Sequence, residues 1–459
     1  MRSPWISAAV IIIALSALGL QAGVVTRTGF LMGDFRAFYC AARVTSQGAN
    51  PYLAEPLRTC ETGIGARRFF ETNPGVTIPA PLPAYAIAAL VPLAMLPFTV
   101  AALLWCALLF AAWIVCVAAL ARVARVPWEV ALAVFSLSLG ALSLPFGEVV
   151  PLAVAFICLA AYYAQQARWR AAALCTAGAM IEPHLGLPVA LALAVWRPAT
   201  RLPLAVAFVL LGALAVVAIG PAANLEYFTS VLPSHALSEA TRDTQYSLTA
   251  ILTALGVVPT IAVKAGAVWY AGMLVIGTIV AGRVAKRSAN EAFLVCVPPA
   301  FAVFGGSFIH VTQIAAALPA ALLLVASPKT EHRAAALVTL LVLVVPWGWV
   351  VSPALIVAPL FPVAYLAWRF WGDNLNAVLV AGIAAAVLLL GLQRLYTVHG
   401  PRLAVPTAAP AIDSRLAEAS WSAYSRKGVT DSVAAWAVRI PTWAALFALL
   451  ALYAPREAP

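Results

Sequence analysis

Residues 5–24, "WISAAVIIIALSALGLQAGV", contain no charged side chain. A helix of about 20 apolar residues crosses the hydrocarbon core of a bilayer, so this stretch predicts a transmembrane helix. Apolar runs of similar length recur along all 459 residues of the chain. The small residues near the end of this first run resemble a cleavage site. The run is nevertheless long for a signal peptide, and we interpret it as an uncleaved anchor.

The chain as a whole is too apolar for a soluble domain. Hydrophobic residues make up 64% of it and charged residues 10%, whereas soluble proteins carry about 25% charged residues. We therefore predict an all-α polytopic membrane protein with roughly 11–13 transmembrane helices. The net charge of +11 comes mostly from short arginine clusters between the apolar runs. Such clusters are typical of cytoplasmic loops, and no aromatic-basic module indicates nucleic-acid binding.

The arginine clusters predict the topology. If they are cytoplasmic, the remaining loops lie on the outer side of the membrane, beginning with a first outer loop over residues 25–78. The clusters are "ARVARV" (121–126), "ARWR" (167–170), "WRPATR" (196–201), "GRVAKR" (282–287), "SPKTEHR" (327–333) and "WRFW" (368–371). Two intervals fit this scheme poorly: residues 79–121 are long for one crossing, and residues 170–197 are short for two.

The C-terminal part is expected to form a separate unit. Residues 1–398 make up the transmembrane bundle, and residues 399–459 form an outer amphipathic segment followed by a final helix. Spans are predicted over residues 376–396 and near residues 440–454. The outer segment carries aromatic residues of the kind that favour the membrane interface, namely Trp421, Tyr424 and Trp436. We interpret this segment as a connector rather than a binding site.

The predicted topology brings several polar side chains to the outer end of the bundle. These are Asp34, Glu148, Glu182, His184, Asp243 and His310. A charged side chain within a membrane span costs at least about 2.5 kcal/mol, so each of these residues requires a reason to be there. Their convergence on one face predicts a single polar cavity that opens outward.

Residues 33–52, "GDFRAFYCAARVTSQGANPY", follow the first span and predict a short amphipathic helix on the outer membrane surface. A stop signal begins at Gly48. Asp34 stands where a helix N-cap belongs, and its carboxylate also suits a general base; the two roles are compatible. Arg36 and Arg43 share one face and suit either a substrate phosphate or lipid headgroups.

The seven cysteines contain no CxxC pair. Cys40 and Cys60 share the first outer loop, where an oxidising compartment would allow a disulfide between them. The others lie in apolar runs and are interpreted as small core residues. The five histidines are scattered and form no HExxH motif. We expect no cofactor and no metal, with a divalent ion on Asp34 and Glu148 as the alternative.

The stretch "DFRAFYCAARVTSQGANPY" (34–52) resembles the first-loop signature of glycosyltransferase family 87, and further segments resemble that family in order. They are "IPAPLPAYAIAALVPLAMLP" (78–97), "LPFGEVVPLAVAF" (144–156), "AGAMIEPHLGLPVAL" (177–191), "DTQYSLTAIL" (243–252) and "FGGSFIHVTQIAAALPA" (304–320). The resemblance implies a GT-C-like fold and a polyprenyl-phosphate sugar as donor, with mannose as the default sugar. It also implies an acceptor that is a glycan or glycolipid.

The resemblance carries roles onto individual residues. Asp34 matches the general base, and His310 matches a contact to the donor phosphate. Two positions depart from the family pattern, since Glu148 replaces a glutamine and Glu182 replaces a lysine that would bind phosphate. His184 and Arg242 are candidates to compensate. The substrate-binding candidates are therefore Arg36, Tyr39, Arg43, Glu148, Glu182, His184, Arg242 and His310.

The leading hypothesis is a multi-pass inner-membrane glycosyltransferase. It would move a hexose from the lipid-linked donor to an acceptor hydroxyl on the periplasmic side, with inversion and with Asp34 as the base. A transporter or flippase of a lipid-linked saccharide is the first alternative, although no inverted repeat is evident. A polysaccharide polymerase or ligase and a non-catalytic homologue are the others.

Overall fold

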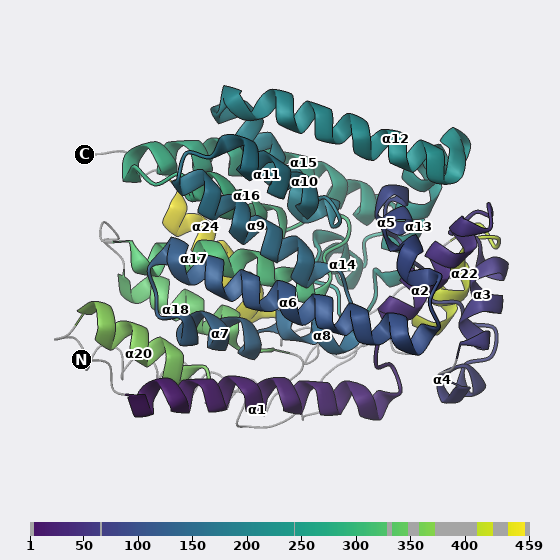
Figure 1. The fold of residues 1–459 in the computed structure, drawn as a ribbon, viewed down its shortest axis with the longest axis horizontal. Helices are drawn as coiled ribbons and strands as arrows, with labels where there is room; N and C mark the ends of the chain where they lie inside the picture. Colours follow the sequence, from purple (N-terminus) through teal and green to yellow (C-terminus); the bar gives the residue numbers. More distant parts are fainter. Residues whose placement is uncertain are drawn as a thin grey trace.

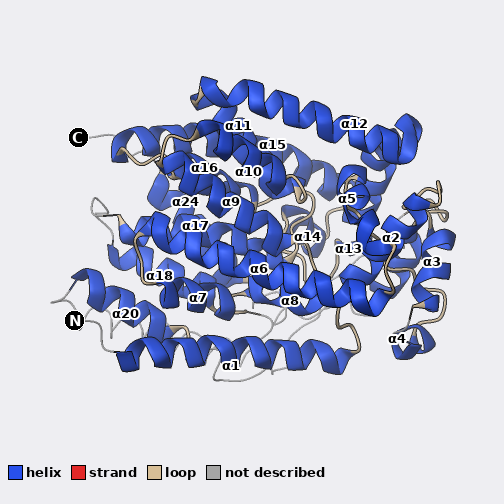
Figure 2. Ribbon diagram, viewed as in Figure 1, coloured by secondary structure: helices blue, strands red, loops and turns tan. Residues whose placement is uncertain are grey.

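The computed structural model describes residues 4–64, 67–242, 244–327, 333–347, 358–371, 411–425 and 439–454. Within these ranges the secondary structure is helical and contains no strand, as Figure 2 shows. Two isolated antiparallel bridges occur, Leu53 with Leu416 and Gln245 with His310. The predicted all-α class is confirmed.

Four helical stretches are long and apolar enough to cross a membrane. They lie in α1 (Pro4–Thr28), in α6 (Phe98–Ala124), in the run from η2 (Pro198–Thr200) through α12 (Arg201–Glu226) and η3 (Tyr227–Val231) to α13 (Leu232–Glu239), and in α15 (Pro259–Ser288). Figure 1 shows α1 and α12 along opposite edges of the bundle, with α6 between them. The span predicted over residues 5–24 is therefore a helix of sufficient length.

Shorter apolar helices fill the space between the long ones. They are α5 (Ala84–Ala94), α9 (Val150–Gln165), α11 (Pro183–Trp196), α16 (Phe293–Ala302), η4 (Val311–Ala317) with α17 (Leu318–Ala326), α18 (Arg333–Val344) and α24 (Ile440–Tyr453). The last of these confirms the helix predicted near residues 440–454. The pair formed by α7 (Trp128–Leu137) with η1 (Leu139–Leu142) and α8 (Ser143–Phe146) is bent by 71°. The span predicted over residues 376–396 lies outside the described residues, so the total helix number stays a prediction.

The two intervals that fitted the topology poorly contain short helices. Residues 79–121 hold α5, which has 11 residues, followed by most of α6. Residues 170–197 hold α10 (Trp169–Ala179) and α11, which pack against each other and reverse direction around Glu182. Helices α10 and α11, with 11 and 14 residues, are each too short to cross a bilayer. The second interval therefore forms a short hairpin whose turn lies at a polar residue.

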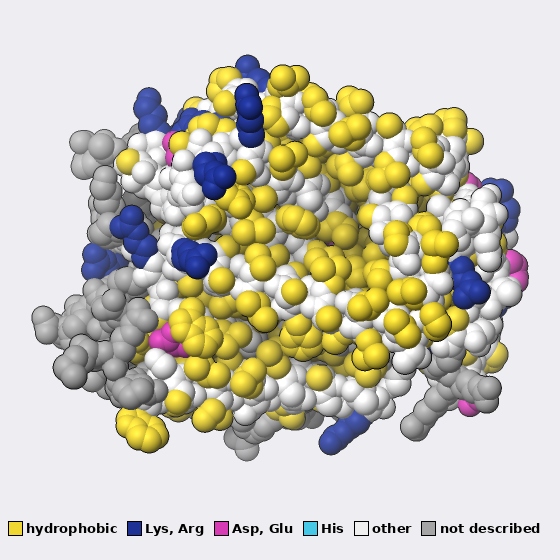
Figure 3. Space-filling model, in the orientation of Figure 1, with side chains coloured by type: hydrophobic (Ala, Val, Ile, Leu, Met, Phe, Trp, Pro, Cys, Tyr) yellow, Lys and Arg dark blue, Asp and Glu magenta, His cyan; other side chains and the backbone are white. Residues whose placement is uncertain are grey.

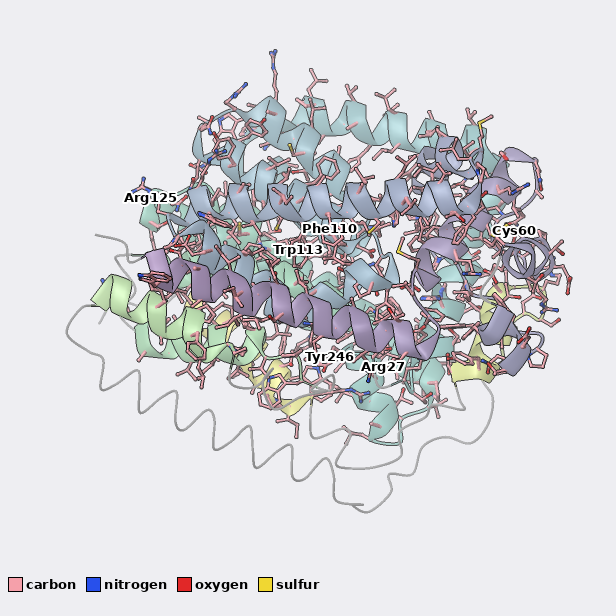
Figure 4. All side chains as sticks on the ribbon, turned by 60° about the horizontal axis from the view of Figure 1, so that its bottom comes forward. Arg27, Cys60, Phe110, Trp113, Arg125 and Tyr246 are labelled. Atoms are coloured by element: carbon pink, nitrogen blue, oxygen red, sulfur yellow. A yellow bond between two sulfur atoms is a disulfide. The ribbon has the colours of Figure 1, made fainter. Side chains whose placement is uncertain are left out.

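The remaining helices mostly gather at one end of the bundle. They are α2 (Gly33–Ser46), α3 (Ala54–Gly63), α4 (Arg67–Thr72), α14 (Leu248–Ala254), α20 (Leu360–Trp371) and α22 (Ala417–Ser425). In Figure 1, α2, α3, α4 and α22 lie together at the right, with α13 and α5 beside them. Figure 4 shows Arg125 at the opposite end from Cys60. In Figure 3, hydrophobic side chains cover the middle of the face, while Lys and Arg lie towards its ends and most densely at the left.

Helix α2 is present as predicted, but its expected position on the membrane surface is wrong. Arg36 is 6% exposed and Cys40 is fully buried, because α3, α5 and α6 pack around the helix. A disulfide joins Cys40 to Cys60 and so fixes α2 to α3. The N-cap is Met32 and no side chain caps this helix, so Asp34 is not a capping residue.

The segment 411–425 docks onto the first outer loop. The Ala54 amide donates to the carbonyl of Arg415 at 2.8 Å, and the Ala417 amide donates to the carbonyl of Tyr52 at 3.1 Å. Trp421, expected at the membrane interface, is only 5% exposed and lies inside the protein. The interpretation of this segment as a mere connector is therefore wrong where the structure describes it. Trp436 and the boundary at residue 398 lie outside the described residues.

Candidate functional site

Five of the predicted polar residues line one cavity of about 260 Å³. They are Asp34, Glu148, Glu182, His184 and His310. They come from four separate places in the chain, yet they meet at the end of the bundle where α2, α5 and α13 lie. The predicted convergence is confirmed for these five. The sixth residue, Asp243, lies outside the described residues.

Backbone contacts bring Asp34 and Glu148 to the same wall. The Met32 amide donates to the carbonyl of Pro145 at 2.7 Å, which joins the start of α2 to α8. Gly147 then turns the chain with φ +79°, a conformation that favours glycine. A Cβ atom at Gly147 would lie 2.8 Å from the Cβ of Phe35, so only glycine allows this approach. Asp34 in the first turn of α2 and Glu148 after Gly147 thus both reach the cavity.

His310 is the centre of the charged groups in the cavity. Its Nδ1 atom lies 3.5 Å from Oε1 of Glu148, and its Nε2 atom lies 4.0 Å from Oε2 of Glu239. Its ring stacks on Phe308 with centroids 6.1 Å apart. Burial alone would lower the pKa of His310, but the carboxylates of Glu148, Glu239 and Asp34 raise it to about 9. The imidazole is therefore a cation at neutral pH.

The Asp34 carboxyl is buried and lies near another negative charge. Burial, and after it the negative charge of Glu148, raises the pKa of the Asp34 carboxyl well above its usual range. The charge of His310 opposes this rise. A carboxylate whose pKa is raised is a stronger base than that of a surface aspartate, and it accepts a proton more readily.

The turn after His310 holds both glutamates in place. The Thr312 hydroxyl donates a hydrogen bond to Oε2 of Glu148. The Gln313 amide donates to Oε1 of Glu182 at 3.0 Å, while its own oxygen accepts from the backbone N–H of His310 at 2.9 Å. One turn therefore positions the cation and orients the two carboxylates beside it.

His184 is held next to Glu182 at the start of α11. Its Nδ1 atom lies 3.1 Å from Oε1 of Glu182, and the Tyr270 hydroxyl donates to the carbonyl of His184 at 3.0 Å. Phe308 lies close to two imidazoles, with its ring centroid 6.2 Å from that of His184 and 4.6 Å from that of His235. An apolar ring surface next to hydrogen-bonding groups suits a sugar ring, which has both kinds of face.

Glu239 is a cavity residue that sequence reasoning missed. Its carboxylate accepts from the Trp421 indole N–H at 2.6 Å and from the Gln245 amide at 2.9 Å. Arg242 lies 3.4 Å from Oε1 of the same carboxylate. The spacing of His235 and Glu239, four residues apart and on one helix face, was a usable signal. Trp421 carried no such signal, because it is far away in the sequence.

Four predicted substrate-binding residues lie elsewhere. Arg242 is directed to Glu239 and lies over the Trp421 ring at 5.0 Å. Arg36 is buried over the ring of Phe98 at 5.2 Å. The Tyr39 hydroxyl donates to the carbonyl of Leu96 at 2.7 Å and lies 3.4 Å from the guanidinium of Arg43. None of Arg36, Tyr39, Arg43 and Arg242 is among the residues that line the cavity.

Within the described part of the chain, no group of three or more histidine, cysteine, aspartate or glutamate side chains is arranged to hold a metal ion. Two carboxylates of the cavity have neighbouring side chains as partners. Glu148 contacts Thr312 and His310, and Glu239 contacts Trp421 and Gln245.

Comparison with known proteins gives one match. No curated protein and no solved structure matches this chain. Residues 83–304 match the model of Glycosyltransferase family 87. The matched region includes Glu148, Glu182 and Glu239, and it ends just before His310. This match supports an assignment to glycosyltransferase family 87. Because the chain is helical and has several apolar helices long enough to span a bilayer, the match supports a membrane glycosyltransferase.

Proposed function

We propose that this membrane protein transfers a hexose, with mannose as the default sugar, from a polyprenyl-phosphate-linked donor to an acceptor hydroxyl on the periplasmic side. The observation that carries the proposal is that Asp34 and His310 line the same cavity. One is a carboxyl group whose pKa is raised, and the other is an imidazole whose pKa is raised to about 9. A base and a cation are the two groups that a direct displacement at an anomeric carbon needs.

In the proposed reaction, the acceptor hydroxyl attacks the anomeric carbon of the donor sugar. Its proton passes to the carboxylate of Asp34 as the new C–O bond forms. The bond between the anomeric carbon and the phosphate oxygen breaks, and the electron pair leaves with the polyprenyl phosphate. The His310 imidazolium stabilises the charge that develops on that oxygen. A single displacement of this kind inverts the anomeric configuration.

The lining of the cavity supports a lipid-linked substrate. Besides the polar groups, it includes Phe228, Val263 and Ala267, which belong to stretches long and apolar enough to cross a membrane. Phe228 is 63% exposed. The cavity is therefore bordered by helices whose outer surface suits lipid, and a donor with an isoprenoid chain can approach from that side. A nucleotide sugar has no comparable apolar part.

Two features support the periplasmic side. The cavity lies at the end of the bundle that carries the disulfide between Cys40 and Cys60, and such bonds persist in oxidising compartments. Arg125 lies at the opposite end (Figure 4), with most of the Lys and Arg side chains that Figure 3 shows. An excess of basic residues is typical of cytoplasmic ends.

The test is sugar transfer by the purified protein in lipid, with synthetic polyprenyl-phosphate mannose and a nucleotide-linked mannose as parallel donors. A panel of glycolipids and glycans serves as acceptors. We expect transfer from the lipid-linked donor alone, and NMR of the product should show the inverted configuration. Transfer from the nucleotide sugar, retention of configuration, or no transfer from any lipid-linked sugar would contradict the proposal.

A further inference from the structure

Trp421 reaches the cavity from a part of the chain that the family match does not include. It lies on α22, it is 5% exposed, and it lines the cavity with Asp34 and His310. Its indole N–H donates to Oε1 of Glu239 at 2.6 Å. Trp421 and Glu239 are 182 residues apart in the sequence. The contact therefore exists only because the C-terminal segment folds back over the site.

Glu239 connects Trp421 to His310. One oxygen of its carboxylate, Oε1, accepts from Trp421 and lies near Arg242. The other oxygen, Oε2, accepts from Gln245 and lies 4.0 Å from Nε2 of His310. Because a carboxylate is planar and rigid, fixing one of its oxygens also fixes the position of the other. The indole N–H therefore helps to set where the charge of Glu239 faces the imidazolium.

The fold holds Trp421 firmly in this position. The Ser420 hydroxyl accepts from the Thr77 amide at 3.0 Å, next to cavity residue Ile78. The Trp421 ring lies under the guanidinium of Arg242 at 5.0 Å and against the ring of Tyr424 at 5.0 Å. An indole ring that is buried against these groups and bonded at its nitrogen has little freedom to rotate.

We propose that Trp421 is a positioning residue of the transfer reaction: its N–H fixes Glu239, and Glu239 in turn orients the His310 ring towards the donor phosphate. This inference rests on the proposed function. Trp421 does not exchange a proton or touch the reacting atoms. It acts through two neighbours, and it makes the C-terminal segment a part of the site rather than a connector.

The competing explanation is that Trp421 only fills space. Two substitutions separate the possibilities. Trp421→Phe keeps an aromatic ring but removes the N–H donor. Trp421→His has a smaller ring, but its five-membered ring superposes on the pyrrole part of indole and places Nε2 where the indole nitrogen lies. A positioning role predicts that the histidine variant retains more activity than the phenylalanine variant, and a packing role predicts the reverse order.

The experiment is a double-mutant cycle on sugar transfer in lipid, with Trp421→Phe, Glu239→Gln and the double variant. Trp421→Phe should lower kcat/KM by roughly tenfold, the size expected for a hydrogen bond to a charged group. In the Glu239→Gln background the same change should have less than about a twofold effect, because the partner charge is gone. Thermal unfolding identifies the variants that fold, and if Trp421→Phe does not fold, Trp421→Leu, which also removes the N–H donor, takes its place in the cycle.

Trp196→Phe is the matched control. Its indole N–H also donates to an acceptor, the carbonyl of Thr278 at 2.8 Å, but it lies at the end of α11 farthest from Glu182. Its kcat/KM should stay within about twofold of the wild type. The inference alone is overturned if the effects of Trp421→Phe and Glu239→Gln on kcat/KM simply multiply in the double variant. It is also overturned if Trp421→His is less active than Trp421→Phe. A wild type that transfers no sugar overturns the proposed function, and the inference falls with it.

Discussion

The Nδ1 atom of His310 lies 3.5 Å from Oε1 of Glu148 in the wall of the cavity. His310 provides a positive charge in a cavity whose lining contains no lysine or arginine among the described residues. Glu182 stands where the family resemblance implies a lysine. Here the cation is an imidazole, and its charge depends on the carboxylates around it. The properties of the site should therefore depend on pH in a way that a lysine site would not.

Replacing Glu148 should change the pH dependence of the reaction. His310 has a pKa of about 9, well above the 6.5 of a free imidazole, so the cation is present at neutral pH and lost as the pH rises through about 9. In Glu148→Gln the strongest neighbouring charge is gone and the pKa of His310 should fall. The alkaline limb of the pH–rate profile should then move to lower pH. Glu55→Gln, which removes an exposed carboxylate from the first outer loop, should leave the limb unchanged. An alkaline limb that stays in place in Glu148→Gln would show that His310 does not supply the charge.

Breaking the disulfide should destabilise the loop that carries Asp34. Cys40 and Cys60 are 20 residues apart, and a cross-link over a loop of this length contributes about 3 kcal/mol to the free energy of unfolding. The Cys40→Ser/Cys60→Ser variant should unfold at a lower temperature and transfer sugar more slowly, since α2 positions Asp34. A reducing agent should have the same effect on the wild type and none on the variant. Equal stability of the oxidised and reduced wild type would contradict this account.

Gly147 should tolerate a side chain less well than another glycine with a similar backbone. Gly147 and Gly48 have φ values of +79° and +74°, but only at Gly147 does a Cβ atom meet a neighbour, the Cβ of Phe35 at 2.8 Å. Gly48→Ala should cost about 1 kcal/mol of stability through backbone strain alone. Gly147→Ala should cost about 2–4 kcal/mol, because overpacking adds to that strain. Denaturation of both variants measures the difference, and equal costs would mean that the contact with Phe35 is not tight.

Glu61 should make the stability of the outer loop depend on pH. Burial raises the pKa of this carboxyl from 4.5 to about 8, although the Ile78 amide and the charges of Arg36 and Arg58 oppose the rise. A raised pKa in the folded state means that stability is full below about pH 4.5 and is lost as the pH rises to about 8. The free energy of unfolding falls by a few kcal/mol over this interval, at about 1.4 kcal/mol for each pH unit between the two pKa values.

Glu61→Gln removes the titrating group and keeps a hydrogen-bond acceptor for the Ile78 amide. Between pH 5 and pH 8, the interval in which Glu61 is expected to lower the stability of the wild type, the melting temperature of Glu61→Gln should change less than that of the wild type. The same slope in both proteins would assign the pH dependence to other groups.

The sequence predicted those features that depend on local pattern and on the cost of charge in a membrane. The first helix, α2 and α24 follow from apolar runs and stop signals, and they lie close to their expected positions. The convergence of Asp34 with His310 follows because a buried charge needs a polar environment. These inferences require no knowledge of how distant segments pack.

Features that depend on long-range packing were not predictable in this way. The polar face of α2 is buried because α3 is joined to it by a disulfide and because Arg36 lies over the ring of Phe98. Trp421 contacts Glu239 only after the C-terminal segment docks on the first outer loop. Nothing in the local sequence of either element specifies these partners.

The most direct test of the account is sugar transfer from polyprenyl-phosphate mannose by the wild type and by Asp34→Asn, both purified in lipid. Asparagine keeps the shape of the side chain but cannot accept the acceptor's proton, so transfer should fall by about 100-fold to 10,000-fold. Asp413→Asn, which changes an exposed aspartate, is the matched control and should transfer sugar at the wild-type rate. Thermal unfolding of all three proteins confirms that they are folded. A folded Asp34→Asn variant that transfers sugar as fast as the wild type would contradict the central claim that Asp34 is the general base.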